Sequence, residues 1–138
     1  MIKIAGIWEV GWNAPIMEVS LWEMVCREFC VDQFYMTPIS GILNKYLTER
    51  QTMEEVLAEN MDLEHVYLHE KAEQTLCSFT HPEKALYLFG RVGPSPMHLK
   101  REGVDHAVRI VTPENGGTLW PHQIACLLLH DRFRKSWQ

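Results

Sequence analysis

The sequence Ala85-Leu86-Tyr87-Leu88-Phe89 is an uninterrupted run of apolar side chains that ends at Gly90. A run this short suits a β-strand, and apolar side chains at successive positions indicate a strand that is buried on both faces. Strands of this kind occur almost only in parallel sheets that helices cover on both sides. The run therefore predicts an α/β fold with a mostly parallel sheet.

Shorter apolar runs and helical patterns alternate along the rest of the chain. We expect further strands at residues 3–8, 33–36, 64–68 and 107–110, and helices at residues 15–29, 53–60 and 119–135. Residues 71–79 fit a helix or a loop. Thr52 and Glu55 have the spacing of a capping box, and Thr118 is a candidate cap of the last helix. The alternation supports an α/β sheet with helices on both faces.

Length and composition indicate one globular domain. The 138 residues are one domain's worth, so we treat residues 1–138 as a single domain. With 46% hydrophobic and 22% charged residues, the composition excludes disordered, collagenous and coiled-coil classes. No apolar stretch approaches the roughly 18 residues of a membrane helix, and the N-terminus lacks a signal-peptide pattern. We therefore expect a cytoplasmic protein without a membrane partner.

Cysteines and histidines offer no metal site by their spacing. Cys26 and Cys30 lie four residues apart in a predicted helix, and we interpret them as two reduced thiols in the core. His65 and His69 have the same spacing, which suits a strand or a surface role when no third ligand is evident. We expect no bound metal.

Charge is distributed unevenly along the chain. Residues 1–69 carry four basic and 11 acidic side chains, whereas residues 70–138 carry nine basic and seven acidic ones. An anionic partner such as a nucleic acid would favour the second half, although a solvated surface explains the same pattern.

Loops rich in glycine and proline follow the predicted strands. Ligands of parallel α/β sheets bind outside the carboxyl ends of the strands. Here those ends lead into residues 9–15, 37–41, 69–75, 90–96 and 111–118. Trp12 lies in the first of these loops, where it fits either simple packing or stacking on a base. The sequence has no Walker loop, dinucleotide fingerprint, zinc-protease motif or nucleophile elbow.

The last third of the chain has a recognisable order of motifs. The apolar strand ending in Phe89-Gly90 is followed by a Gly/Pro loop, the strand Val108–Ile110, Thr112-Pro113, and Thr118-Leu119-Trp120 at the start of a long helix. This order resembles the closing pattern of the SPOUT (SpoU/TrmH-type) methyltransferases. The beginning of the chain is similar to the family too, with a first strand, a loop containing Asn13, an amphipathic helix and then Val31-Asp32.

The resemblance implies a fold, a cofactor and a substrate. The family fold is a parallel α/β sheet with a C-terminal trefoil knot, whose loops hold S-adenosylmethionine largely through backbone groups. By position these loops are residues 68–71, 88–96 and 110–119. The cofactor-binding residues that the resemblance implies are Leu88, Phe89, Gly90, Ile110, Pro113, Thr118 and Leu119. Relatives methylate RNA (tRNA or rRNA), often at the ribose 2′-OH, as homodimers whose first and last helices meet.

The catalytic pattern of the family is incomplete in this chain. Asn13 matches the family's loop asparagine, but Val19, Val92 and Trp120 lie where the family has an arginine, a glutamate and an asparagine. Arg91, just after the strand-ending Gly90, is our candidate for a substitute in proton handling. The resemblance thus predicts an S-adenosylmethionine-dependent RNA methyltransferase with slow turnover.

Two alternatives remain open. One is a catalytically silent protein of the same fold that binds S-adenosylmethionine or RNA, and the other is an unrelated flavodoxin-like module. Bound S-adenosylmethionine or a knotted C-terminus would separate the methyltransferase and the silent protein of the same fold from the flavodoxin-like module.

Both terminal helices carry more apolar side chains than one buried stripe needs. These residues are Trp22, Val25 and Phe29 in the first helix and Leu127, Leu128, Phe133 and Trp137 in the last. Since a monomer rarely exposes a large apolar patch, we expect a homodimer.

Overall fold

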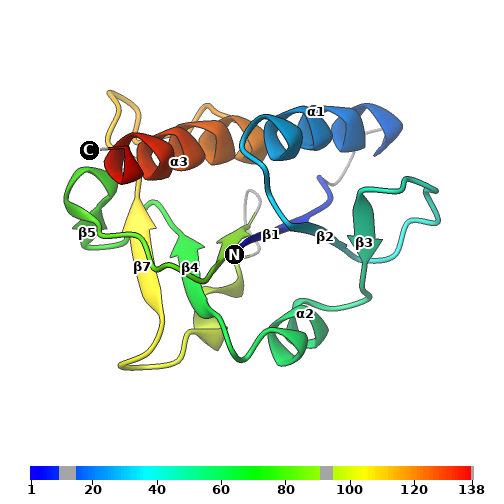
Figure 1. Cartoon of the computed structure of the whole chain (residues 1–138), viewed down its shortest axis with the longest axis horizontal. Coiled ribbons are helices and arrows are strands. Elements are labelled where there is room, and N and C mark those ends of the chain that lie inside the picture. Colours follow the sequence, from blue (N-terminus) through cyan, green and yellow to red (C-terminus); the bar gives the residue numbers. More distant parts are fainter. Residues whose placement is uncertain (10–14, 91–94, 138) are drawn as a thin grey trace.

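The computed structural model describes residues 1–9, 15–90 and 95–137. Within these ranges seven parallel strands form one sheet in the order β3-β2-β1-β6-β4-β7-β5 (Figure 1). The strands are β1 (Ile2–Ile7), β2 (Gln33–Thr37), β3 (Leu47–Glu49), β4 (Glu64–Leu68), β5 (Gln74–Thr75), β6 (Ala85–Phe89) and β7 (His106–Arg109). The α-helices are α1 (Pro15–Glu28), α2 (Met53–Glu59) and α3 (Pro121–Ser136), and the 3₁₀ helices are η1 (Leu76–Ser78) and η2 (Pro96–Leu99).

The apolar strand β6 occupies the interior of this sheet. It pairs with β1 on one side and with β4 on the other, and no residue of it is more than 1% exposed. Tyr87 and Phe89 point into one core, and Leu86 and Leu88 into the other. The prediction of a parallel sheet buried on both faces is confirmed.

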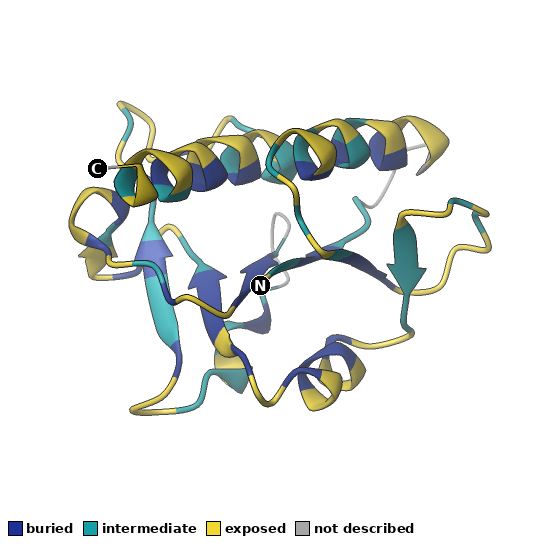
Figure 2. Cartoon of the chain, in the orientation of Figure 1, coloured by how far each residue is buried: buried dark blue, intermediate teal, exposed yellow. Residues whose placement is uncertain are grey.

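Helices cover both faces of the sheet. Helices α1 and α3 lie along one face and α2 lies on the other, each with its buried side toward the strands (Figures 1 and 2). On the first face Trp22 stacks on Phe34 at 5.6 Å between ring centroids and meets Phe89 edge-on at 5.5 Å. On the second face Val56 and Leu57 of α2 pack into the other core. Each helix therefore excludes water from one side of the central strands.

Most predicted elements are confirmed to within two residues. Strand β4 has the predicted bounds, and Thr52 caps α2 by accepting the Glu55 N–H at 3.3 Å. The Glu55 carboxylate reaches back to the N–H of Gln51, one residue earlier than in a standard capping box.

Three details differ from the sequence-based expectations. The last helix begins at Pro121, and its cap residue is Trp120 and not Thr118. The N–H of Trp120 donates to Gln123 Oε1 at 2.9 Å. Leu119 belongs to a turn that donates back to the Gly116 carbonyl, and a proline suits the first helical position because it needs no N–H partner there. Strand β3 was not predicted, and the ambiguous residues 71–79 form β5 and η1; both strands are too short to show a period.

The interpretation of Cys30 as a core thiol is wrong. All four cysteines are free, but Cys26 is buried while Cys30 is exposed. Helix α1 ends at Glu28, and Cys30 adopts a left-handed backbone conformation with φ of 54°. The helical spacing therefore does not extend to Cys30, and the two thiols do not share a face.

A buried polar network fixes the C-terminal half of α3 to the sheet. The His81 ring donates from Nε2 to Asp131 Oδ2 at 2.8 Å and accepts the Tyr87 hydroxyl at Nδ1 at 2.7 Å. Arg132 donates to the same Tyr87 oxygen at 2.8 Å, and Lys135 lies 2.8 Å from Asp131. Burial lowers the pKa of His81; it also opposes the Asp131 carboxylate, but hydrogen bonds from Lys135 and His81 outweigh it and lower that pKa.

Replacing His81 with phenylalanine should destabilise the fold and flatten its response to acid. We expect a loss of about 1–3 kcal/mol in the free energy of unfolding, because Tyr87 and Asp131 each lose a buried partner. Since the pKa of His81 is lowered in the folded state, its neutral ring contributes stability above the ordinary pKa of 6.5, and this stability is lost as the pH falls.

Urea unfolding at about pH 7.5 and about pH 5 measures both effects. The wild type should lose more stability over this interval than His81→Phe. The exposed His130 of the same helix, replaced by phenylalanine, is the matched control. A His81→Phe protein with the wild-type pH dependence contradicts the assignment.

Candidate functional site

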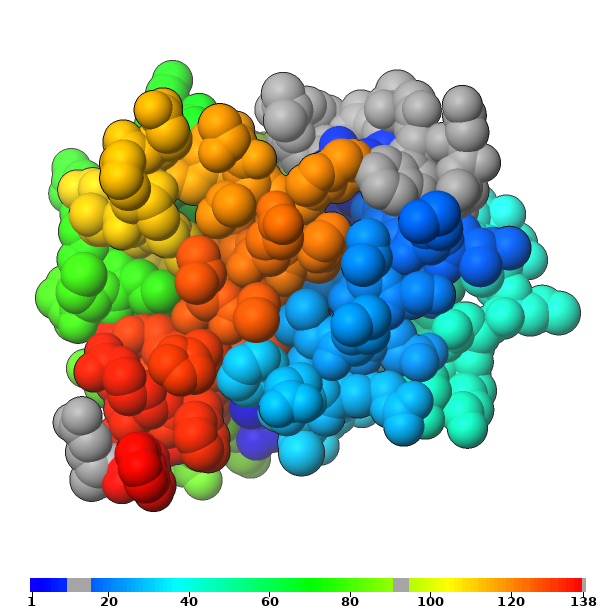
Figure 3. All heavy atoms as spheres, turned by 90° about the horizontal axis from the view of Figure 1, so that it is seen from above, coloured from blue at the N-terminus to red at the C-terminus, as the bar shows by residue number. Residues whose placement is uncertain are grey.

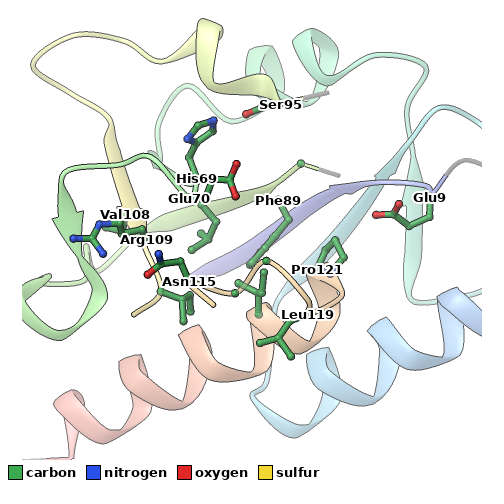
Figure 4. A pocket seen from close by; sticks show the side chains of 16 residues that line it. Glu9, His69, Glu70, Phe89, Ser95, Val108, Arg109, Asn115, Leu119 and Pro121 are labelled. Carbon is green, nitrogen blue, oxygen red and sulfur yellow. The ribbon is translucent and has the colours of Figure 1, made fainter. Parts of the chain in front are cut away.

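A cavity of about 300 Å³ opens at the carboxyl ends of β4, β6 and β7 (Figure 4). It lies where parallel sheets place their ligands, and its volume is at the lower end of the range for small-molecule pockets. Its lining comes from the ends of these strands, from the loop before α3 and from the first turn of α3. The lining residues are Glu9, Leu68, His69, Glu70, Phe89, Gly90, Ser95, Val108, Arg109, Ile110, Asn115, Gly116, Gly117, Leu119, Pro121 and Ile124.

One part of the lining is apolar. Phe89 ends the central strand, Ile110 follows β7, Leu119 comes from the turn before α3, and Ile124 comes from the first turn of α3. Phe89 and Ile110 belong to the main core, so the positions of their side chains are fixed by packing. This surface can bury a flat apolar group such as an aromatic ring.

The loop before α3 presents main chain to the cavity. The Thr112 hydroxyl accepts the Gly116 N–H at 2.9 Å, and Glu114 O accepts the Gly117 N–H at 2.9 Å. Asn115 and Gly116 both adopt positive φ, 51° and 76°, a conformation that glycine and asparagine tolerate best. Gly116 is buried, and a Cβ atom on it would lie 3.6 Å from Ile124. The Asn-Gly-Gly sequence therefore brings the backbone close to the site.

Charged and polar side chains surround the opening. Glu9 follows β1, His69 and Glu70 follow β4, and Arg109 ends β7. The N–H of His69 donates to Val108 O at 3.0 Å, which ties the end of β4 to β7. His69 Nδ1 accepts the Lys71 N–H at 3.1 Å, so the hydrogen of the neutral ring is on Nε2. His69 thereby offers a hydrogen-bond donor near the cavity.

The buried carboxylate of Glu18 lies next to the backbone of Glu9. Glu18 in α1 is 3% exposed, and its Oε2 is 3.5 Å from the backbone nitrogen of Glu9. The pKa of Glu18 is raised to about 7, chiefly by burial; the hydrogen bond from the Glu9 N–H opposes this rise and the charge of Glu9 adds to it. The next residue, Val19, is 2% exposed and packs in the interior, so this turn of α1 contributes no cation beside the cavity.

The cavity brings together four of the predicted cofactor-binding residues. Phe89, Gly90, Ile110 and Leu119 line it, and the three loops implied by the family resemblance all contribute to it. The other three predicted residues lie outside the lining. Leu88 is fully buried in the core on the α2 face, while Pro113 and Thr118 are exposed in the loop before α3.

The two predicted catalytic residues, Asn13 and Arg91, lie outside the residues that the structure describes. So does Trp12. Their roles, and the binding roles of the lining residues, stay predictions.

Sequence reasoning did not assign a site role to Glu9, His69, Glu70 or Asn115. The loops that carry them were predicted to lie at the carboxyl ends of the strands, and that was the available signal. The spacing of His65 and His69 does not bring them to one site, because His65 is buried within strand β4 with its Nε2 2.8 Å from Asn60 O. Within the described ranges no group of three or more His, Cys, Asp or Glu side chains is arranged to hold a metal. No described helix is long and apolar enough to cross a membrane.

Comparison by sequence finds no match. No protein-family model matches this chain, and no curated protein matches its sequence significantly. The fold, in contrast, has many counterparts among solved structures.

A candidate RNA methyltransferase from Bacillus anthracis aligns over 98% of this chain and 94% of its own, with 19% identity and a TM-score of 0.73. A structure solved to explain the 2-OH methylation of C/U34 on tRNA aligns over 99% and 97%, with 13% identity and a TM-score of 0.68. A SpoU methyltransferase from Streptomyces viridochromogenes, in complex with AdoMet, aligns over 99% of this chain, with 11% identity and a TM-score of 0.74. This chain spans 58% of that enzyme. The likeness thus lies in the backbone, and this chain has the fold of the SpoU/TrmH-type RNA methyltransferases.

Proposed function

We propose that this protein is an S-adenosylmethionine-dependent RNA methyltransferase that modifies a ribose 2′-OH of tRNA or rRNA. The observation that carries the proposal is the cavity at the ends of β4, β6 and β7, built from the three loops that the family resemblance assigns to the cofactor. The neighbours of the same fold, one holding AdoMet and one concerned with tRNA 2-OH methylation, support the cofactor and the substrate class.

The lining residues fit S-adenosylmethionine in their chemistry. The apolar surface of Phe89, Ile110 and Leu119 suits an adenine ring, and the backbone of Gly116 and Gly117 can meet its polar edges. When bound, the cofactor supplies a methyl group on a positively charged sulfur. The residues of this chain bind it, orient it toward the acceptor and exclude water from one side of it.

Replacing Gly90 with leucine should remove cofactor binding. Gly90 lines the cavity directly after the central strand, where an added side chain would occupy the ligand's space. We expect calorimetric titration with S-adenosylmethionine and with its demethylated product S-adenosylhomocysteine to give a binding signal for the wild type and none for Gly90→Leu. Ala58→Leu, which introduces the same side chain at an exposed position of α2, is the control. Unchanged binding by Gly90→Leu would mean that the site lies elsewhere.

Binding of S-adenosylmethionine or RNA without catalysis is the second candidate function, and the residues at two positions of α1 and α3 favour it. Val19 is buried and Trp120 caps α3, so neither position offers the polar side chain that the family has there. A protein with this pocket and no proton-handling group would bind S-adenosylmethionine or RNA without catalysis. General acid–base assistance is typically worth about 10²–10⁴-fold in rate, so its loss leaves binding with weak turnover.

Transfer of a labelled methyl group to total cellular RNA separates these functions. We expect slow transfer by the wild type and a further decrease for Arg91→Ala, because Arg91 is our candidate for handling the proton of the acceptor. Lys45→Ala, at an exposed position between β2 and β3, is the control. Rapid transfer that survives Arg91→Ala would exclude Arg91 from this role. A complete absence of transfer together with tight cofactor binding would favour the silent alternative.

The proposal includes a homodimer formed through the outer surface of α1 and α3. These helices lie side by side over one face of the molecule (Figure 3). Trp22 and Leu128, two residues that suggested a dimer from the sequence, instead fill the monomer's own core. Leu127, Phe133 and Trp137 remain 43%, 57% and 79% exposed, and the last two rings stack at 6.4 Å between centroids. This apolar surface is the part that a second copy would cover.

Replacing Phe133 and Trp137 together with glutamate should yield a monomer. The added charges cannot be buried without partners, whereas both positions are exposed in the single chain, so folding should persist. Light scattering at micromolar concentration should report a dimer for the wild type and the mass of one 16.1 kDa chain for the variant. A wild type that is already monomeric contradicts this part of the proposal.

Three further properties follow from the resemblance and belong to the proposal. They are a single methyltransferase domain over residues 1–138, a C-terminal trefoil knot in the loops around the cavity, and a cytoplasmic location, where tRNA and rRNA are modified.

A further inference from the structure

The charges around the cavity are arranged asymmetrically. Glu9 and Glu70 lie at opposite sides of the space above Phe89, while the guanidinium of Arg109 lies on the side away from Glu9 (Figure 4). These carboxylates come from different strand ends, one after β1 and one after β4. The part of the cavity next to Phe89, at the end of β6, is therefore bordered by two acidic side chains.

The position of Glu70 is set by the backbone around it. On its N-terminal side the His69 N–H is held by Val108 O at 3.0 Å, and on its C-terminal side the Ala72 N–H donates to His69 O at 3.1 Å. The Lys71 N–H is held by His69 Nδ1 at 3.1 Å. Glu70 is thus carried on a turn that the end of the sheet anchors. Among the residues that the structure describes, its carboxylate has no ion-pair partner.

Glu9 reinforces the negative potential from the other side. Its backbone nitrogen lies 3.5 Å from Oε2 of the buried Glu18, whose pKa is raised chiefly by burial and to a smaller extent by the charge of Glu9. Arg109 adds one positive charge to the lining on the side away from Glu9, and Glu70 is exposed, so the two carboxylates leave a partly screened net negative charge near Phe89. A cation in this part of the cavity is stabilised, and a neutral group of the same shape gains nothing from the field.

We propose that Glu70, with Glu9 across the cavity, makes this site prefer the cationic methyl donor S-adenosylmethionine to its neutral product S-adenosylhomocysteine. The inference rests on the proposed function. The two ligands differ by one methyl group and by the positive charge on sulfur, so a negative cavity distinguishes them by charge. Such a preference favours departure of the product after each transfer, and it assigns Glu70 as a residue that determines ligand specificity.

Calorimetric titration of the full chain with each ligand tests this inference. We expect the wild type to bind S-adenosylmethionine about three- to fivefold more tightly than S-adenosylhomocysteine, the range of a partly exposed charge interaction. Glu70→Gln should bring the ratio of the two dissociation constants close to one, mainly by weakening the donor. Glu9→Gln should lower the ratio in the same direction. Raising the salt concentration to about 0.5 M should reduce the wild-type preference, because the interaction is screened.

Glu73→Gln is the matched control, since Glu73 is exposed on the same segment but outside the cavity lining. It should retain the wild-type ratio. If Glu70→Gln binds both ligands with the wild-type ratio, the inference is overturned while the proposed function stands. If the wild type binds neither ligand, the proposed function fails and this inference fails with it.

Discussion

Burial of the central strand on both faces is the constraint on which the rest of this structure depends. The five residues of strand β6 can be buried on both faces only if other strands flank it and helices cover both faces of the sheet. The flanking strands β1 and β4 are parallel to it, so their carboxyl ends meet at one edge of the sheet. The loops that follow them are brought together there, and the cavity forms among these loops. A packing requirement in the core thus decides where a ligand can bind.

The chemistry of the cavity is divided between backbone and side chains. Loop residues with positive φ, Asn115 and Gly116, bring peptide groups toward the space beside Phe89 and Ile110. That arrangement depends on the turn geometry and, at Gly116, on the absence of a side chain. Charged groups enter from other strand ends, where Glu70 and Glu9 border the opening. Under the proposed function, binding of the methyl donor and selectivity for it would depend on separate parts of the chain.

Helix α3 connects this site to the outer surface of the molecule. Its first turn lines the cavity through Pro121 and Ile124, and in its last turns Asp131 and Lys135 bind to the segment between η1 and β6. Between these anchors the helix keeps its inner residues in the core and leaves Leu127 and Phe133 exposed. Leu127 and Phe133 lie on the surface of α3 that the proposed dimer would bury.

The sequence by itself determined the architecture, because the apolar run at residues 85–89 and the alternation around it require a covered parallel sheet. It also predicted a ligand pocket at Gly90, Ile110, Pro113 and Leu119, since strand ends in such a sheet share an edge; all but Pro113 line the cavity, as does Phe89, which the family resemblance implied. Only the tertiary structure decided the rest. The short edge strands β3 and β5 exist through pairing with neighbours and are too short to carry a period of their own. Cys30 left the core because α1 ended two residues before it. Glu9 and Glu70 border the same cavity because the order of strands in the sheet brings together segments that are distant in the chain. For the same reason His81 lies between Tyr87 and Asp131. No local pattern records that order.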